Sequence, residues 1–381
     1  MKITSTLIGK KTDPEAAAPA TTTGPDGSLQ IKRETELNLA RIMDLAVPDD
    51  SLLVLMYGSP DPDSIASAMA LRELLQRTRG LAKGVFASTE SLSRQQNYEF
   101  IFSMHINIQL INNVDAASYR LIALVDAQPS FLGEILNGLQ PQIVFDHHPR
   151  EGEWYAPVED IRPNYGALST IMTEYLLCAN IRIPRILHTA LLYGIKTDTD
   201  NFDRDTISED ISAYTYHTKY ANMQLIRRIE LNQTPGRFLK YFDHAFHHMI
   251  NFRGRRVCFL GKVESSDVCV QVADFYLRLI GTYYVVVAGI VDNRLIITFR
   301  GDGYRQNCGT LAQKAFGLYG NGGGHRSAAR MEILLEVLQK RLNISLSQQN
   351  IDRFLIENLG RGQKPKPEPV QAESPATGKE N

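Results

Sequence analysis

The sequence predicts an α/β protein: a parallel sheet in the N-terminal part, then a helical connector, then a smaller α/β domain. Two observations predict this class. Between about residues 51 and 178, short apolar runs bounded by turn residues alternate with longer helical patterns, which is typical of strand–helix units in a parallel sheet. From residue 256 onward, three further apolar runs and two helical patterns follow a mainly helical stretch. With 381 residues, the chain is long enough for two domains.

The N-terminal elements follow in order along the chain. Short apolar runs predict strands at SLLVLMYG, RLIALVDA and PQIVFDHH. Helical patterns follow them at SIASAMALRELLQR, SFLGEILNGL and ALSTIMTEYLLCAN. Ligands of such sheets bind at the carboxyl ends of the strands. We therefore expect the acidic and histidine residues that end these runs to converge.

The remainder of the chain predicts a connector and a second domain. Residues 206–250 have helical patterns, strands are expected at VCFLGKV, TYYVVVAGIV and RLIITFRG, and helices at VQVADFYLRLI and GTLAQKAFGLYG. Both chain ends are rich in Ala, Thr, Pro and Gly and have no apolar periodicity. The expected organisation is a disordered tail over residues 1–33, a metal-binding domain over 34–235, a helical connector over 236–250, a substrate-binding domain over 251–359 and a disordered tail over 360–381.

Charge is distributed unevenly along the chain. The formal net charge is −1, but residues 34–235 carry 16 basic and 26 acidic side chains, whereas residues 236–345 carry 15 and 8. This contrast indicates metal binding in one domain and anion binding in the other. The near-neutral total argues against a partner such as long double-stranded nucleic acid.

Other classes of protein are excluded by composition. No run approaches the roughly 18 apolar residues of a membrane span, and the N-terminus lacks the apolar stretch of a secretory signal, so we expect a soluble cytoplasmic protein without a membrane partner. The four cysteines stand far apart without a C-x-x-C pair. They predict isolated thiols rather than a disulfide framework or a thiolate zinc site.

Four sites share an acidic or histidine residue just after an apolar run that we interpret as a strand. They are Asp61 and Asp63 in SPDPDSIAS, Asp126 in LIALVDAQP, Asp146, His147 and His148 in IVFDHHP, and Asp198 in LLYGIKTDTDNF. Carboxylates mixed with imidazoles suit Mn²⁺ or Mg²⁺. For any single Asp, a turn or helix-cap role is an alternative.

In order and spacing, these motifs resemble the DHH phosphoesterase superfamily. A fifth match is FRGDG at residues 299–303 with NGGGH at residues 321–325, which resembles the DHH-associated C-terminal domain. The resemblance spans about residues 50–342 and implies an active site in the cleft between the two domains. Members with this pair of domains include nanoRNases, pAp phosphatases, cyclic-dinucleotide phosphodiesterases and, more distantly, RecJ-like exonucleases.

The resemblance also implies roles for individual residues. Asp126 would bridge two Mn²⁺ ions, of which Asp63, His147 and Asp198 would hold one and Asp61 the other. His148 would face the substrate phosphate, and Asp146 would orient an imidazole, so Asp126, His148 and Asp146 form the expected catalytic set. The substrate phosphate would meet residues of the basic domain, namely Arg300, Gly322, Gly323, Gly324 and His325, with the three glycines offering N–H groups as an anion nest.

One position departs from the family pattern. Most members have a ligand His four residues before the first Asp of the first motif, where this chain has Tyr57, and a neutral phenol is a poor metal ligand. Three explanations stay open: Tyr57 or a water completes the second site, the second metal is weakly held, or catalysis is impaired.

These residues and the family resemblance together predict a Mn²⁺-dependent phosphoesterase with two metal sites, of which the second is weak under one of the three explanations, and with Mg²⁺ as an alternative ion. Its expected substrates are short oligonucleotides or small nucleotides: nanoRNA, pAp, or cyclic and linear dinucleotides. Two alternatives stay open, namely a catalytically impaired nucleotide-binding or regulatory module and a pyrophosphatase or polyphosphatase. The oligomeric state is also open, with a homodimer as one option.

Overall fold

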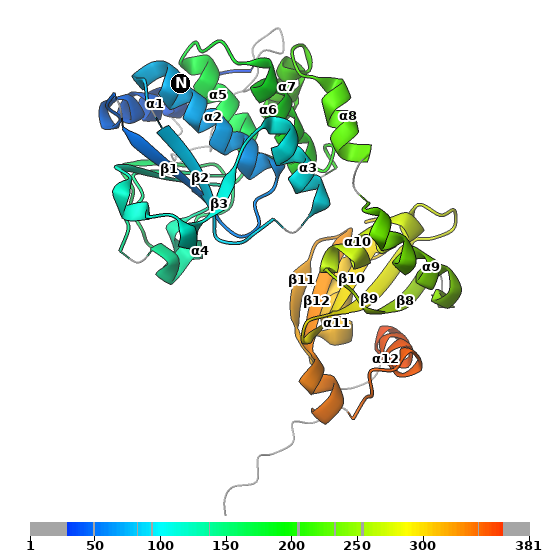
Figure 1. Cartoon of the computed structure of the whole chain (residues 1–381). Helices are drawn as coiled ribbons and strands as arrows, with labels where there is room; N and C mark the ends of the chain where they lie inside the picture. The colour runs from blue at the N-terminus through cyan, green and yellow to red at the C-terminus, as the bar shows by residue number, and fades with distance from the viewer. Residues whose placement is uncertain are drawn as a thin grey trace, which may run out of the picture. The chain divides into compact units, whose positions relative to one another are not determined.

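The computed structural model describes residues 29–360, except residues 49, 82, 93, 137, 204–205, 232–233, 253–254 and 342. The tails predicted for residues 1–33 and 360–381 lie almost wholly outside the described residues. The chain divides into two compact units, one up to residue 233 and one from residue 234 onward. Both are mixed α/β units, as the sequence predicts (Figure 1).

The first unit is built on a six-stranded sheet in the order β3-β2-β1-β4-β5-β6, in which every neighbouring pair is parallel. Its strands are β1 (Ser51–Met56), β2 (Lys83–Ser88), β3 (Ile108–Leu110), β4 (Leu121–Val125), β5 (Ile143–Asp146) and β6 (Val158–Ile161). Its helices are α1 (Arg33–Leu45), α2 (Pro62–Arg79), α3 (Gln95–Met104), α4 (Pro129–Leu132), α5 (Leu168–Cys178), α6 (Arg185–Asp198), α7 (Ser208–Thr218) and α8 (Met223–Leu231). The strands β2, β3 and β6 were not among the predicted elements.

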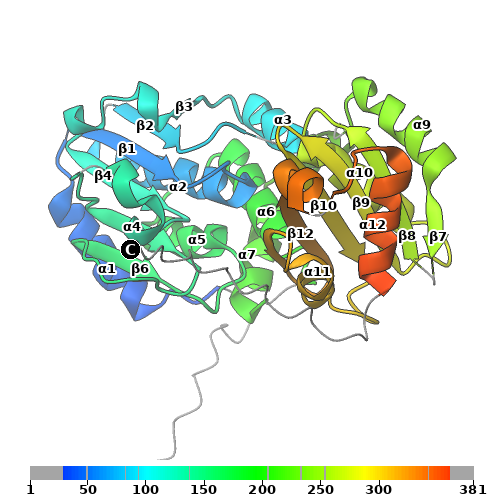
Figure 2. The same ribbon diagram turned by 90° about the horizontal axis from the view of Figure 1, so that it is seen from below.

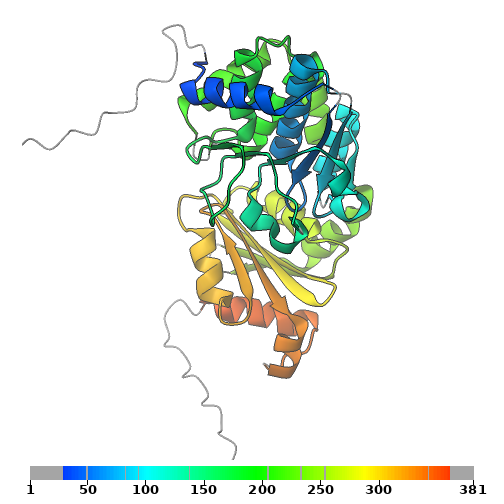
Figure 3. The same ribbon diagram turned by 90° about the vertical axis from the view of Figure 1, so that its left-hand side faces the viewer.

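Both faces of this sheet are buried, which explains the continuous apolar strands in the sequence. In β1, Leu52, Val54 and Met56 join the core formed with α2, α5 and α6, whereas Leu53 and Leu55 face the opposite side. That opposite side is covered by α4 and by short turns and loops. Figure 3 shows the first unit in a second view, with α1 in dark blue among its other helices.

Two predictions for this unit are wrong in detail. The run SFLGEILNGL forms only the short α4 and a 3-10 turn, Gly133–Leu136, because the chain reverses at Gly133 with φ of 47°. The run LLYGIKTD is not a strand but the second half of α6, which begins at Arg185. Asp198 is therefore the last residue of a helix, and it reaches the site from the layer that covers the sheet.

The second unit has a six-stranded sheet in the order β11-β12-β10-β9-β8-β7, antiparallel except for the pair β8 and β9. Its strands are β7 (Ile250–Phe252), β8 (Arg255–Lys262), β9 (Tyr284–Val291), β10 (Arg294–Gly301), β11 (Asn321–Gly324) and β12 (Ala328–Leu334). Its helices are α9 (Leu239–His248), α10 (Ser266–Leu277), α11 (Cys308–Phe316) and α12 (Gln348–Gly360). Helices α9 and α10 cover one face and α11 and α12 the other (Figure 2).

The stretch predicted as a connector is helical but has a packing role. Phe238, Tyr241 and Ala245 are buried in one core of the second unit, so α9 is part of that unit rather than a free linker. Within the part of the chain that the structure describes, no helix has both the length and the apolar composition for crossing a bilayer.

Candidate metal centre

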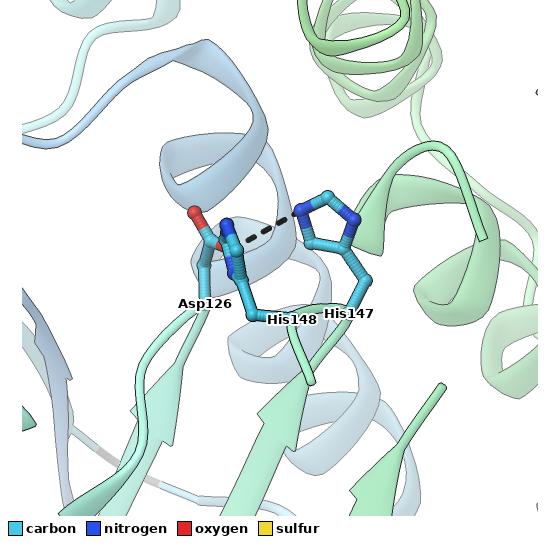
Figure 4. Close-up of side chains that lie close together, drawn as sticks. All are labelled: Asp126, His147 and His148. Carbon is cyan, nitrogen blue, oxygen red and sulfur yellow. Dashed lines mark ion pairs between the residues drawn. The ribbon is translucent and has the colours of Figure 1, made fainter. Parts of the chain in front are cut away.

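The structure brings most of the predicted ligands of the first unit together at the carboxyl ends of β1, β4 and β5. Asp126 directly follows β4, His147 directly follows β5, and Asp63 lies in the first turn of α2 after β1. Among the described residues, two groups have ligand atoms within 4.8 Å of one another: Asp63 with His147 and Asp198, and Asp126 with His147 and His148. Figure 4 shows both imidazoles beside Asp126.

Asp63 is held by the first turn of another helix. Its Oδ2 accepts a hydrogen bond from Leu168 N (2.7 Å) and its Oδ1 one from Ser169 N (2.9 Å), so the start of α5 binds this fully buried carboxylate. Helix α6 passes close by at Gly194. A Cβ built on Gly194 would lie 3.0 Å from Asp63 Oδ1 and 2.4 Å from Ser169 Oγ, so only glycine lets α6 pack here.

His147 presents one defined nitrogen to the carboxylates. Its Nδ1 lies 3.0 Å from the carbonyl oxygen of Tyr165, and because a carbonyl can only accept, Nδ1 carries a proton. Nε2 then lies 3.1 Å from Asp198 Oδ2 and 3.5 Å from Asp126 Oδ1. In the neutral ring, Nε2 carries a lone pair that faces two carboxylate oxygens. Three electron-rich atoms so close together require a cation or a proton between them.

The buried oxygens of the cluster support the same conclusion. Among the described residues, Asp126 Oδ1 and Asp198 Oδ2 are buried side-chain atoms without a hydrogen-bond partner. Such oxygens are costly unless a cation or ordered water binds them. The donor set is carboxylate oxygen with imidazole nitrogen and contains no thiolate, which suits Mn²⁺ or Mg²⁺. The residues present therefore fit a divalent metal ion.

Ser64 links the remaining predicted ligand, Asp61, to this cluster. Asp61 is the N-cap of α2, and its Oδ1 accepts from Ser64 N and from Ser64 Oγ, both at 2.9 Å. The same hydroxyl lies 2.5 Å from Asp126 Oδ2. Ser64 thus bridges the two carboxylates that, by the family resemblance, would hold the second metal ion.

The charge balance of the cluster is visible in its pKa values. Burial, together with the charges of Asp126 and Asp198, raises the pKa of Asp61 to about 6, and burial raises the pKa of Asp63 well above its usual range. Burial alone would lower the pKa of His147, but the surrounding carboxylates outweigh it and raise that pKa to about 11. The cluster holds excess negative charge that a divalent cation would neutralise.

The side chain of Asp146 contacts the ring of His148 rather than that of the candidate ligand His147. Its Oδ1 accepts from His148 Nδ1 at 2.9 Å and from the backbone N–H groups of both histidines. Its Oδ2 accepts from the buried Gln128 Nε2 at 2.7 Å. The carboxylates of Asp126, whose Oδ1 lies 3.4 Å from His148 Nδ1, and of Asp146, which accepts a hydrogen bond from that nitrogen, raise the pKa of His148 to about 10. The carboxylate thus orients the exposed imidazole of the pair.

A buried ionic network fixes the carbonyl that orients His147. The Tyr165 hydroxyl donates to Glu174 Oε1 at 2.6 Å. Arg162, which is 6% exposed, donates to Asp160 at 2.6 and 2.7 Å and to Glu174 Oε2 at 2.8 Å. The loop that carries the Tyr165 carbonyl is thereby tied to buried charges, as is usual for groups that support a metal-bound histidine.

A second histidine pair is buried between α6 and α7. His188 Nδ1 lies 2.7 Å from His217 Nδ1, and His217 Nε2 lies 2.8 Å from the hydroxyl of Thr173. That hydroxyl donates to Ser169 O, so His217 Nε2 carries the proton and His188 donates to His217. Burial lowers the pKa of His188 to about 4 and that of His217 to about 3. Both rings are therefore neutral near pH 7.

A hollow of about 320 Å³ opens beside the cluster. Its polar lining includes Asp61, Ser64, Asp126 and His148, and its apolar lining is made by Tyr57, Pro60 and Phe131. Tyr57 is 50% exposed, and its ring contacts Phe131 with centroids 5.8 Å apart and planes tilted by 53°. Tyr57 thus lies at the site, in the wall of the hollow.

The predicted phosphate-binding residues of the second unit lie on neighbouring strands. Arg300 on β10 pairs with Ala328 on β12, and Gly324 on β11 pairs with Ala329. Arg300 Nε donates to Asp274 Oδ1 at 2.8 Å, and His325 is exposed in the turn after β11. The three glycines form an extended edge strand without positive φ, so the predicted nest conformation is wrong. Gly322 and Gly324 serve strand pairing rather than a nest, because a Cβ at either position would clash with the backbone of β12.

Sequence reasoning missed several residues that shape the site. Ser64 and Gln128 lie inside the recognised motifs DPDSIAS and VDAQP, so their position beside a ligand was an available signal. Gly194 could have been noticed as a small residue one helical turn before Asp198. The Tyr165 carbonyl had no signal, because its role depends on backbone geometry.

The fold and the cluster define a class: a parallel α/β domain with a carboxylate–imidazole centre at its strand ends, followed by a second α/β unit. Residues 51–195 match the DHH family, N-terminal domain. This part of the chain is therefore a DHH-family domain. The match covers β1 through most of α6, including every ligand candidate except Asp198.

Two curated relatives extend the likeness along the chain. An uncharacterised protein of Methanocaldococcus jannaschii is 32% identical over 312 residues, which are 81% of this chain and 62% of that protein. This chain therefore spans less than two thirds of that relative's length. The bifunctional oligoribonuclease and PAP phosphatase NrnA of Mycoplasma genitalium is 26% identical over 303 residues, covering 74% of this chain and 87% of that protein.

A solved structure supports the fold of both units. It is an exopolyphosphatase-related protein from Bacteroides fragilis, which is 15% identical, has a TM-score of 0.64 and aligns over 86% of this chain and 96% of its own. At this identity the likeness concerns the fold alone.

Proposed function

We propose that this protein is a Mn²⁺-dependent phosphoesterase that hydrolyses phosphate esters of short oligonucleotides or small nucleotides, such as nanoRNA, pAp or dinucleotides. The carrying observation is His147: its Nδ1 is committed to the Tyr165 carbonyl, and its Nε2 faces Asp198 and Asp126. The similarity to NrnA, an oligoribonuclease and PAP phosphatase, supports this substrate class.

The geometry supports the ligands that the family resemblance implies. Asp63, Asp126, His147 and Asp198 would hold one ion; Asp126 and Asp61, joined through Ser64, would hold the second, weaker one. Bound divalent metal would supply an acidified water and charge neutralisation at the phosphoryl oxygens. Mg²⁺ is an alternative ion.

Side chains of the protein would bind and orient the substrate phosphate. His148 is turned by Asp146 and lines the hollow, where it can donate a hydrogen bond to a phosphate oxygen. The excess of basic residues over 236–345 suits the anionic substrate, and Arg300 and the 322–325 stretch are the proposed contacts. An active site between the two units, a cytoplasmic location and a homodimer stay predictions.

A hydrolysis screen tests the proposal. The substrates are pAp, RNA and DNA of two to five nucleotides, cyclic dinucleotides and, as a control without a base, pyrophosphate, each with and without Mn²⁺. We expect Mn²⁺-dependent turnover of at least one nucleotide substrate, faster than that of pyrophosphate. Tight Mn²⁺ binding without hydrolysis would instead identify a binding module, and faster release of orthophosphate from pyrophosphate would identify a pyrophosphatase.

A further inference from the structure

The apolar wall of the hollow is not explained by metal binding. Tyr57 is half exposed, and Phe131 is only partly buried: it packs against the core beneath α4 and also lines the hollow. Single exposed aromatic rings are common on protein surfaces, but two rings in contact that line the same hollow form a continuous apolar surface of the kind that marks a binding site. Together with Pro60, the two rings give one side of a polar, carboxylate-rich site an apolar surface.

The geometry of the two rings limits how a ligand can use them. Their centroids are 5.8 Å apart and their planes are tilted by 53°, so the rings already contact each other and leave no slot between them. A planar group would instead lie on the outer surface of the pair. The same hollow is also lined by Asp126 and His148, so a group stacked on the two rings would belong to a ligand that can also reach the candidate metal centre.

We propose that Tyr57 and Phe131 form a stacking wall for the nucleobase next to the scissile phosphate. This inference deepens the proposed function and rests on it for the identity of the ligand. A hollow of about 320 Å³ is in the usual size range of small-molecule sites, with an apolar wall and a few polar groups. Stacking on aromatic side chains tolerates every base, since each has a π-face.

The proposal also gives Tyr57 a role other than that of a metal ligand. Its ring, rather than its hydroxyl, is the functional part. A substrate with a base gains from the wall, whereas pyrophosphate or polyphosphate has no group to place on it. The wall therefore selects nucleotides over phosphate chains without a base.

Fluorescence of a base analogue tests this role directly. The probe is a hydrolysis-resistant dinucleotide with a phosphonate linkage and one 2-aminopurine, whose emission is quenched when it stacks on an aromatic ring, titrated in the presence of Mn²⁺. We expect quenching by the parent protein, and for Phe131→Leu a dissociation constant about 5- to 100-fold higher with most of the quenching lost. Phe131→Trp and Tyr57→Phe keep a ring and should keep the quenching.

A matched control is Phe102→Leu, which removes a ring that is 70% exposed on α3, in the same unit but outside the hollow. It should bind the probe like the parent. Unchanged quenching and affinity in Phe131→Leu, or loss of quenching in Tyr57→Phe, would overturn the stacking wall. If the parent quenches the probe but hydrolyses no phosphate ester, the proposed function fails and the wall stands.

Discussion

Replacing Gly194 by alanine tests whether helix packing sets the position of Asp63, a proposed metal ligand. Alanine is favoured over glycine inside a helix by up to about 1 kcal/mol, so helix propensity alone predicts stabilisation. The structure predicts the opposite. The added methyl group would lie 2.4 Å from Ser169 Oγ and 3.1 Å from the backbone Cα of Asp63, both fully buried.

Overpacking of this kind costs roughly 1 to 3 kcal/mol, which equals or exceeds the gain in propensity. The net loss of up to about 2 kcal/mol corresponds to a fall in Tm of up to roughly 8 °C for a unit of this size. Displacing Asp63 from the start of α5 should also weaken Mn²⁺ binding about 10- to 100-fold.

Thermal denaturation monitored by circular dichroism and Mn²⁺ titration by calorimetry measure the two effects. Gly236→Ala is the control, because a Cβ at Gly236 would meet nothing within 4 Å and its φ is not positive. A Tm equal to or above that of the parent, with unchanged Mn²⁺ affinity, would refute the close packing of α6 on Asp63.

Three further predictions follow from buried groups. Lowering the pH from 6.5 to 4.5 should reduce the free energy of unfolding by up to about 2 kcal/mol for each of His188 and His217, because their pKa values lie below the ordinary value and the unfolded chain binds protons first. Urea denaturation at both pH values checks this, and His217→Gln should show a smaller drop. Arg162→Met leaves two buried carboxylates without their cation and should lower the free energy of unfolding by about 3 to 5 kcal/mol in the same assay. An unchanged free energy of unfolding would show that the network is dispensable. Ser64→Ala should weaken Mn²⁺ binding about 10-fold in calorimetry. The control is Ser67→Ala, one turn further along α2, whose buried hydroxyl has no hydrogen-bond partner among the described residues and whose loss should leave Mn²⁺ affinity unchanged. Equal effects of the two substitutions would argue against the bridging role of Ser64.

The sequence predicts the candidate ligands at the strand ends well. At these positions the type of the residue and its place directly after an apolar run both indicate a ligand site. An acidic residue directly after a buried strand, as at Asp126, is exposed to a single edge of the sheet, and parallel strands bring such edges together. His147, directly after β5, follows the same logic, and Asp63, in the first turn of the helix that follows β1, joins them in one cluster.

Asp198 shows where this logic stops. Its apolar run is buried on all sides, and a short buried run does not distinguish helix from strand by periodicity. The cluster nevertheless includes Asp198, because α6 packs on α2 and ends at the metal centre.

The glycines of NGGGH show a different limit. Three consecutive glycines predict a flexible turn or a nest when read alone, but a neighbouring strand determines their conformation here. The backbone of β12 approaches so closely that Gly322 and Gly324 have no room for a side chain. That constraint arises from residues 328–334, and local sequence does not reveal it.

The most direct test of a metal-dependent phosphoesterase is Mn²⁺-stimulated hydrolysis of a linear dinucleotide by the parent protein and by Asp126→Asn, with correct folding of both confirmed by circular dichroism. The account predicts turnover by the parent that depends on added Mn²⁺, and a loss of at least about 1,000-fold in the variant, whose amide cannot replace a bridging carboxylate. Undiminished Mn²⁺-stimulated turnover by Asp126→Asn would contradict it.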